Sequence, residues 1–191
     1  DALPIFVKTH PSEDERFENL GKTLSVFIPR TMDSLGDIRS RAVEGIQFML
    51  FTNHLLSQSK LEEPDMSPPK ILNKLGSIRK RIGKIEDLND QFALVHQLAA
   101  VLGEILEHSD LSDMLVGSLD GLLDFQLGAS RGTCVIIYGV LSTQGESLGE
   151  KVMKTVVNGL VDKIPLIENE QTRHGTLNAI KSIASHHLGN I

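Results

Sequence analysis

Hydrophobic residues recur at spacings of three and four along most of the chain, which is the period of one face of an α-helix. A clear example is the run Ile71, Leu75, Ile78, Ile82 and Ile85. Strict alternation of apolar and polar residues over six or more positions, the pattern of a strand, is absent. The chain is therefore predicted to be all-α, with eight helices in four antiparallel hairpins at about 12–58, 67–107, 109–143 and 146–188.

Polar residues and prolines indicate where these helices begin and end. Ser12 with Glu15, and Ser147 with Glu150, have the spacing of a capping box. The other expected starts are Asp37, Ser67, Asp87, Asp110 and Asp124, and the last helix is expected over about 168–187 with Leu177 facing inward. Residues 1–11 lack helical spacing and are expected to form an irregular N-terminal arm.

One short segment recurs and suggests how the hairpins are arranged. Leu35 through Ala42 reads as a tight corner followed by a helix, and a similar segment returns at Leu122 through Ala129. Gly36 is expected to end one helix in the left-handed conformation, and Asp37 to cap the next. A recurring corner with flanking helices is typical of a right-handed α-solenoid of about four repeats. An eight-helix bundle is the alternative architecture.

The small residues of this segment carry a second prediction. Ala42, Ala129 and, in a weaker echo that begins at Asp87, Ala93 occupy matching places one turn inside a second helix. These are the places where two helices would have to approach closely. We therefore expect Ala42 and Ala129 to be buried where hairpins meet.

Composition narrows the classes of function. The chain has 191 residues and a net charge of −6, which argues against a general nucleic-acid binder. Its single cysteine, Cys134, rules out an internal disulfide, and no apolar run approaches the ~20 residues of a membrane span. The absence of a signal peptide leads us to expect a cytoplasmic protein. Because the first residue is Asp, we expect a segment of a longer repeat protein.

Candidate catalytic and binding motifs are weak. Gly21-Lys22-Thr23 lacks the earlier glycine and the preceding strand of a phosphate-binding loop. The seven histidines include no pair on one helical face, as a zinc site would need, and Cys134 lies mid-helix, where a small buried hydrophobe is expected. We therefore expect no enzymatic activity, no cofactor and no metal.

Several segments resemble one known family. Asp37 at a corner with Arg41 one turn later resembles the HEAT-repeat pattern, in which such residues interact between neighbouring repeats. Gly121-Leu122-Leu123-Asp124, Gly132 to Gly139, and the stretch from Arg173 to Leu188 are similar to the maestro heat-like repeat family. The resemblance covers about residues 20–188. It implies a non-enzymatic array of helical repeats that acts as a scaffold or adaptor, with Asp37, Arg41 and Asp124 as structural corner residues.

The charge pattern supplies the candidate partner-binding residues. Lys70, Lys74, Arg81 and Lys84 fall within about 80° on one predicted helix, whereas the segment 85–130 contains nine acids and no Lys or Arg. These four cations either dock an acidic partner or pair internally with the acidic neighbour, and the internal pairing is favoured here.

Taken together, these patterns favour a protein–protein interaction scaffold. A peripheral membrane module that uses the basic helix face is the main alternative, and a hydrolase is a distant third. Partners are therefore expected to be proteins, with no nucleic acid and no transmembrane segment. The C-terminal hairpin is also expected to mediate self-association, because its last helix carries Leu177, Ile180 and Ile183 at core spacing.

Overall fold

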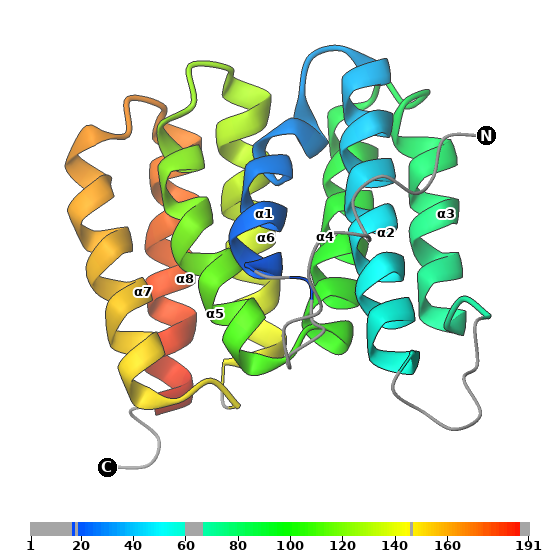
Figure 1. The fold of residues 1–191 in the computed structure, drawn as a ribbon. Coiled ribbons are helices and arrows are strands. Elements are labelled where there is room, and N and C mark those ends of the chain that lie inside the picture. The colour runs from blue at the N-terminus through cyan, green and yellow to red at the C-terminus, as the bar shows by residue number, and fades with distance from the viewer. Residues whose placement is uncertain (1–16, 18, 60–66, 146, 188–191) are drawn as a thin grey trace.

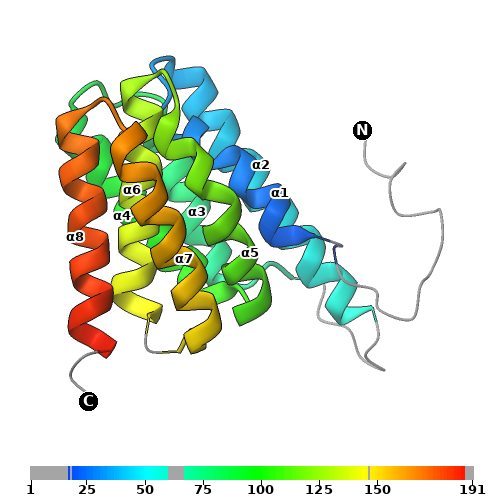
Figure 2. The same ribbon diagram turned by 90° about the vertical axis from the view of Figure 1, so that its left-hand side faces the viewer.

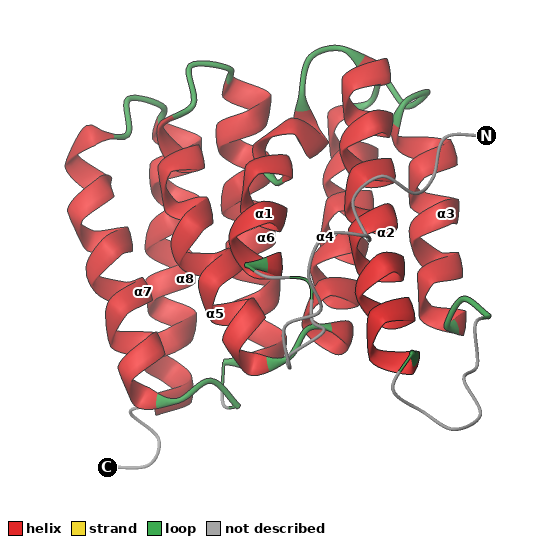
Figure 3. Ribbon diagram, in the orientation of Figure 1, coloured by secondary structure: helices red, strands yellow, loops and turns green. Residues whose placement is uncertain are grey.

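All regular secondary structure in the described part of the chain is helical. The computed structural model describes residues 17, 19–59, 67–145 and 147–187, and this part contains α-helices and short 3₁₀ helices but no strand (Figure 3). The helices are α1 (Leu20–Phe27), α2 (Gly36–Gln58), α3 (Lys70–Ile82), α4 (Leu88–Ile105), α5 (His108–Ser118), α6 (Leu127–Gln144), α7 (Glu150–Lys163) and α8 (Glu170–His187). The predicted all-α class is confirmed. The N-terminal arm at 1–11 and the capping box at Ser12 lie outside the described residues.

The helices form two layers whose spatial order differs from their order in the chain. One layer contains α7, α5, α1 and α2, and the other contains α8, α6 and α4; α3 closes the far end against both α2 and α4 (Figures 1 and 2). The last two hairpins stack in sequence, as in a solenoid. The first helix, however, packs mainly on α5 of the third hairpin, and α4 packs on α6.

The turns from the first to the second helix of each hairpin lie along one edge of the array (Figure 1). Three of them begin with a 3₁₀ helix: η1 (Pro29–Met32), η2 (Leu119–Leu123) and η3 (Ile164–Leu166). Proline stands first in η1 and second in η3, where its missing N–H costs no helical hydrogen bond. At Pro29 the α-helix does not continue: α1 ends at Phe27, and the chain goes on in this tighter turn.

Aliphatic side chains fill the space between the layers. Fully buried Leu and Ile residues come from every helix from α1 to α7, and they include Leu24, Ile46, Leu75, Leu98, Leu111, Ile136 and Leu160. Ala42 and Ala129 are 4% and 0% exposed, so their predicted burial is confirmed, whereas Ala93 is exposed on α4. The close approach in α4 uses Ala99 instead, which is 0% exposed.

Several predicted helix starts are displaced. Of the expected starts that lie in the described residues, only Asp87 caps its helix as expected, by accepting the N–H groups of Asn89 and Asp90. The N-cap of α3 is Pro69, that of α5 is Glu107, and that of α7 is Gly149. The Ser147–Glu150 capping box is therefore wrong, since the Ser147 hydroxyl donates to the Gln144 carbonyl instead.

The inward face of α8 is only partly the one expected: Ile183 is buried and Ile180 packs against the core, but Leu177 does not face inward. Leu177 is 48% exposed, and the buried positions are Thr172, Thr176, Ala179 and Ile183. Both threonines satisfy their hydroxyls locally: Thr176 donates to the Thr172 carbonyl, and Thr172 to the Asn169 side chain. A threonine whose hydroxyl is bonded can replace an aliphatic residue on a buried face, and this is why the apolar pattern missed Thr172 and Thr176 and turned Leu177 inward.

Candidate functional site

The corner between α1 and α2 is organised by a buried arginine that the sequence patterns did not single out. Arg39 is 5% exposed and stands in the first turn of α2. Its guanidinium donates to the carbonyls of Asp33 (2.8 Å) and Ser34 (3.2 Å) in its own corner. It also donates to those of Ile82, the last residue of α3, and of Ile85 just beyond it (both 2.9 Å). One side chain therefore joins two corners of the array.

The same place in the other hairpins holds a residue with the same task. Gln91 donates to the Ile85 carbonyl, Ser130 to the Leu122 carbonyl, and Arg173 to the Ile167 carbonyl. Each of these residues is the fourth of its helix and reaches back to the corner before it. The real repeat signal is thus a side-chain donor in the first turn of the second helix.

The first and third corners are joined by an ion-pair bridge. Arg30 in η1 contacts Asp33 at 3.2 Å and also pairs with Asp124 after η2. Asp33 and Asp124 each accept a backbone N–H two residues further on, from Leu35 and Gln126. Asp33 in the first corner is therefore equivalent to Asp124 in the third corner. The predicted alignment had matched Asp124 with Asp37, four residues further along the chain.

The roles expected of Gly36, Asp37 and Arg41 are wrong. Leu35 is the N-cap of α2, Asp37 lies exposed in its first turn, and no glycine in the described residues has a positive φ. Arg41 is exposed and pairs within its own helix with Glu44, at 2.7 Å. This hydrogen bond lowers the pKa of the Glu44 carboxyl. Arg39 and Arg30 carry the inter-corner contacts because they point toward the neighbouring corner, whereas Arg41 points to solvent.

The four predicted binding residues lie exposed along one face of α3 and just beyond its end. We call Lys70, Lys74, Arg81 and Lys84 the α3 basic face. The opposite face buries Leu72, Leu75 and Ile82, which fixes the rotation of the helix and turns the cations outward. The structure therefore leaves all four predicted residues exposed at the end of the array, three of them on α3 and Lys84 in the turn that follows it.

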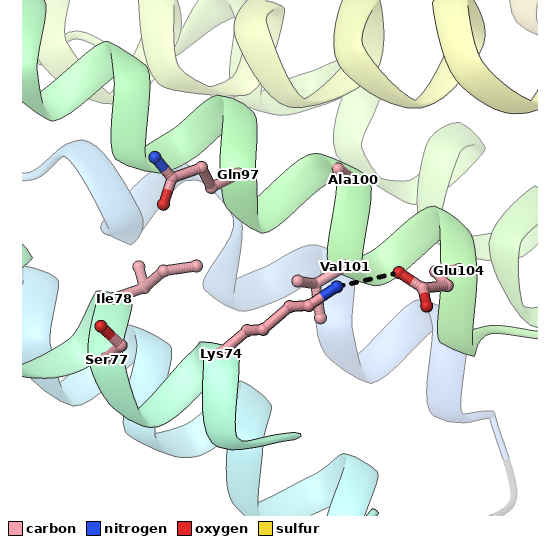
Figure 4. Close-up of a pocket in the computed structure, with 7 residues that line it drawn as sticks. All are labelled: Lys74, Ser77, Ile78, Gln97, Ala100, Val101 and Glu104. Atoms are coloured by element: carbon pink, nitrogen blue, oxygen red, sulfur yellow. Dashed lines mark hydrogen bonds and ion pairs between the residues drawn. The ribbon is translucent and has the colours of Figure 1, made fainter. Parts of the chain in front are cut away.

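A groove runs beside this face, between α3 and α4 (Figure 4). Its volume is about 280 Å³, and its apolar floor includes Ile78 and Val101, which are 2% and 3% exposed. Lys74 reaches across it to Glu104, with Nζ and Oε2 3.4 Å apart and both side chains 60% exposed. The groove combines an apolar floor with polar groups on its two rims, which suits one or two inserted side chains more than an enclosed small molecule.

Internal neutralisation of the α3 basic face is limited. Lys74 has the exposed pair with Glu104, but within the described residues Lys70, Arg81 and Lys84 form no ion pair. The internal pairs of α3 use Arg79 instead, which contacts Glu44 of α2 at 2.9 Å. Exposed pairs of the Lys74 type contribute at most about 1 kcal/mol and open easily.

The remaining candidate groups have structural roles. Lys22 and Thr23 bond back to Asn19, and Gly21 packs against the Asp110 backbone, so this segment is an ordinary first helical turn. Cys134 is buried between α6 and α8, and burial raises its pKa to about 11. In the described residues no cluster of three metal-ligating side chains occurs, and no helix is long and apolar enough to cross a membrane.

Comparison with known proteins places this arrangement in a family. Residues 2–191 match the family model described as Maestro, HEAT repeats. The chain belongs to this family. It is 37% identical over 175 residues to the Maestro heat-like repeat-containing protein family member 1 of Dictyostelium discoideum, and 24% identical over 176 residues to the protein of that name from Bos taurus.

The matched region is a small part of these relatives. Each alignment covers 92% of this chain and 10% of the relative, so the chain spans about a tenth of their length. No solved structure gives a significant match. The predicted family and the helical-repeat fold are confirmed, and the chain is one helical-repeat segment of the kind found in much longer Maestro proteins.

The glycines that carry the Maestro resemblance lie at helix contacts. A Cβ at Gly132 would stand 2.4 Å from the Met32 side chain, and one at Gly139 would stand 2.7 Å from the Cβ of Ala99. Distances this short are overlaps, so any larger residue would force α6 away from η1 and α4. These two glycines of the family motif therefore specify close packing between the helices.

Proposed function

We propose that this chain is a non-enzymatic protein-binding segment, and that its α3 basic face docks an acidic stretch of a partner protein. The observation that carries the proposal is four exposed cations beside a groove, three of them without an ion pair in the described residues. An acidic segment can pair with these cations while an apolar residue enters the groove over Ile78. Complementary charge of this kind raises association rates and selects partners.

Peripheral membrane binding is the second candidate, because the same cations could meet anionic lipid. Near an anionic bilayer each such charge contributes about 1 kcal/mol. The groove favours the protein partner, because its apolar floor of Ile78 and Val101 can receive an apolar side chain of a peptide, whereas a lipid headgroup would meet the cations alone. A cytoplasmic location is part of this proposal.

The test compares two variants with the same change of charge. In the first, Lys70, Lys74, Arg81 and Lys84 are replaced by Gln; in the control, the exposed Lys22, Lys151, Lys154 and Lys181 are replaced instead. Binding of a labelled 16-residue Glu/Leu peptide is measured by fluorescence anisotropy, and binding of vesicles with phosphatidylserine by co-sedimentation.

The proposal expects the first variant to bind the peptide about tenfold more weakly, while the control binds as the unchanged chain does. Free energies of unfolding should stay within about 0.5 kcal/mol of the unchanged chain in both. Equal peptide binding by both variants would contradict the docking site. Loss of stability without loss of binding would show that the cations pair internally. Selective loss of vesicle binding would favour the membrane candidate.

A further inference from the structure

The corner edge of the array exposes apolar side chains that the proposed function leaves unexplained. Four large hydrophobic residues of the described chain are at least 60% exposed, and three of them stand at corners: Phe125 (91%), Leu35 (64%) and Leu166 (60%). Leu123 and Leu127 flank Phe125 and are 38% and 47% exposed. We call these five residues the apolar edge. They belong to the first, third and fourth corners.

These three corners are neighbours in space. Arg30 pairs with Asp33 of the first corner and Asp124 of the third. The third and fourth corners are joined by Lys163 and Asp120, 2.5 Å apart, and by the hydroxyls of Ser130 and Thr172, 3.3 Å apart. Figure 1 shows the same corners side by side along one edge. The apolar residues therefore form a row across the array.

The surroundings of this row are acidic. Segments 33–38, 119–127 and 164–170 contain six acids and no Lys or Arg. Arg30 and Lys163 pair with three of the six, and Arg39 and Arg173 donate to carbonyls of the first and fourth corners, which leaves a local charge of −2 (six acids, four cations). Asp37, Glu168 and Glu170 are exposed. A partner that covers the row must therefore supply apolar anchors and positive charge together.

The spacing of the corners indicates the shape of that partner. Packed helices lie about 8–10 Å apart, so successive corners repeat at about that distance. An α-helix advances about 10.5 Å in seven residues, so side chains at i, i+7 and i+14 would meet three successive corners. We infer that the apolar edge binds a cationic amphipathic helix of about 15–18 residues from a protein partner. The acids exclude an anionic membrane as the preferred ligand, because like charges would meet there.

The test uses the full 191-residue chain and an 18-residue amphipathic Leu/Lys peptide, with a scrambled peptide of the same composition as a reference. One variant carries Phe125→Ser, Leu35→Ser and Leu166→Ser. The matched control carries Val26→Ser, Phe48→Ser and Val116→Ser, three exposed apolar residues outside the corners. Neither variant changes the net charge. Circular dichroism melting checks both folds, and the single variant Phe125→Ser serves if the triple variant is unstable.

The inference expects the edge variant to bind the amphipathic peptide about tenfold or more weakly, because anchor residues dominate such interfaces. The control variant should bind normally, and the scrambled peptide weakly. Equal binding by the edge and control variants, or by both peptides, would overturn the inference, because it would show nonspecific attraction to an acidic protein. If the unchanged chain and the control variant bind anionic vesicles and the edge variant does not, the inference would be overturned in favour of a lipid ligand. Since the α3 basic face is untouched, these outcomes are separate from those of the first proposal.

Discussion

The most informative residue of the fold is Arg39, a buried cation that forms no ion pair with a carboxylate among the described residues. Burial lowers the pKa of its guanidinium, and the nearby Asp33 opposes this shift. Its five N–H donors fit a guanidinium surrounded by carbonyl oxygens, whereas the single ammonium of a lysine could not reach two corners at once. The residue therefore ties the α1–α2 corner to the end of α3.

Replacing Arg39 should destabilise the chain strongly. Arg39→Ala removes the donor to four carbonyls and leaves several of them buried without a partner, so we expect a loss on the order of 3 kcal/mol. Arg41→Ala, two residues further along α2, is the control and should change stability by less than about 0.5 kcal/mol, because its ion pair is exposed. Urea unfolding of both variants gives the comparison. Similar losses in the two would contradict the assignment.

Cys134 should make stability depend on pH in the alkaline range. Its pKa is about 11 in the folded chain and 9.0 for an ordinary thiol. The folded state thus holds its proton more tightly, so the stabilisation is complete below pH ~9 and is lost as the pH rises to 11. The advantage of the unchanged chain over Cys134→Ala should shrink by about 2 kcal/mol between pH 8 and 11. A difference that does not vary with pH would contradict this.

At the scale of elements, hydrophobic periodicity predicts long helices with one apolar face well, and it predicts where those helices end poorly. The α3 stripe was correct because an amphipathic helix against one neighbour has a single apolar face. The cap of α4 was correct because Asp87 bonds within its own turn. The corner residues Arg30 and Arg39 were missed because their partners, Asp124 and Ile82, are distant in the sequence, and short periodic patterns carry no information about such contacts.

Ala129 gives the sharpest test of packing between elements. It is fully buried in α6, so Ala129→Leu should overpack the contact and cost about 1–3 kcal/mol. Ala93→Leu is the control: it makes the same change on the exposed side of α4 and should leave the melting temperature nearly unchanged. Thermal unfolding followed by circular dichroism measures both. An unchanged melting temperature in Ala129→Leu would show that the site can relax.

At the scale of the whole molecule, the order of the helices within the two layers could not be predicted from the sequence. A recurring corner predicts that hairpins stack, but it does not say which hairpin neighbours which. Here α1 has only eight residues and lies between α2 and α5. The two helices of the first hairpin therefore pack more on other helices than on each other, and α1 lies inside the array although it comes first in the chain. The α3 basic face, in contrast, needed only one helix and its buried side, and both could be predicted from residues 70–84.

The end of the array that is formed by α7 and α8, opposite the end closed by α3, should associate with a second copy of the chain. Val161 and Leu177 of these helices are 49% and 48% exposed, and repeat arrays stay soluble through polar end faces. The weight-average mass in analytical ultracentrifugation should therefore rise with concentration. Val161→Lys with Leu177→Lys should remain monomeric, whereas the control Val26→Lys, exposed on α1 away from this end, should associate like the unchanged chain. A monomeric unchanged chain at the highest concentration would contradict the prediction, and equal suppression by the control would place the contact elsewhere.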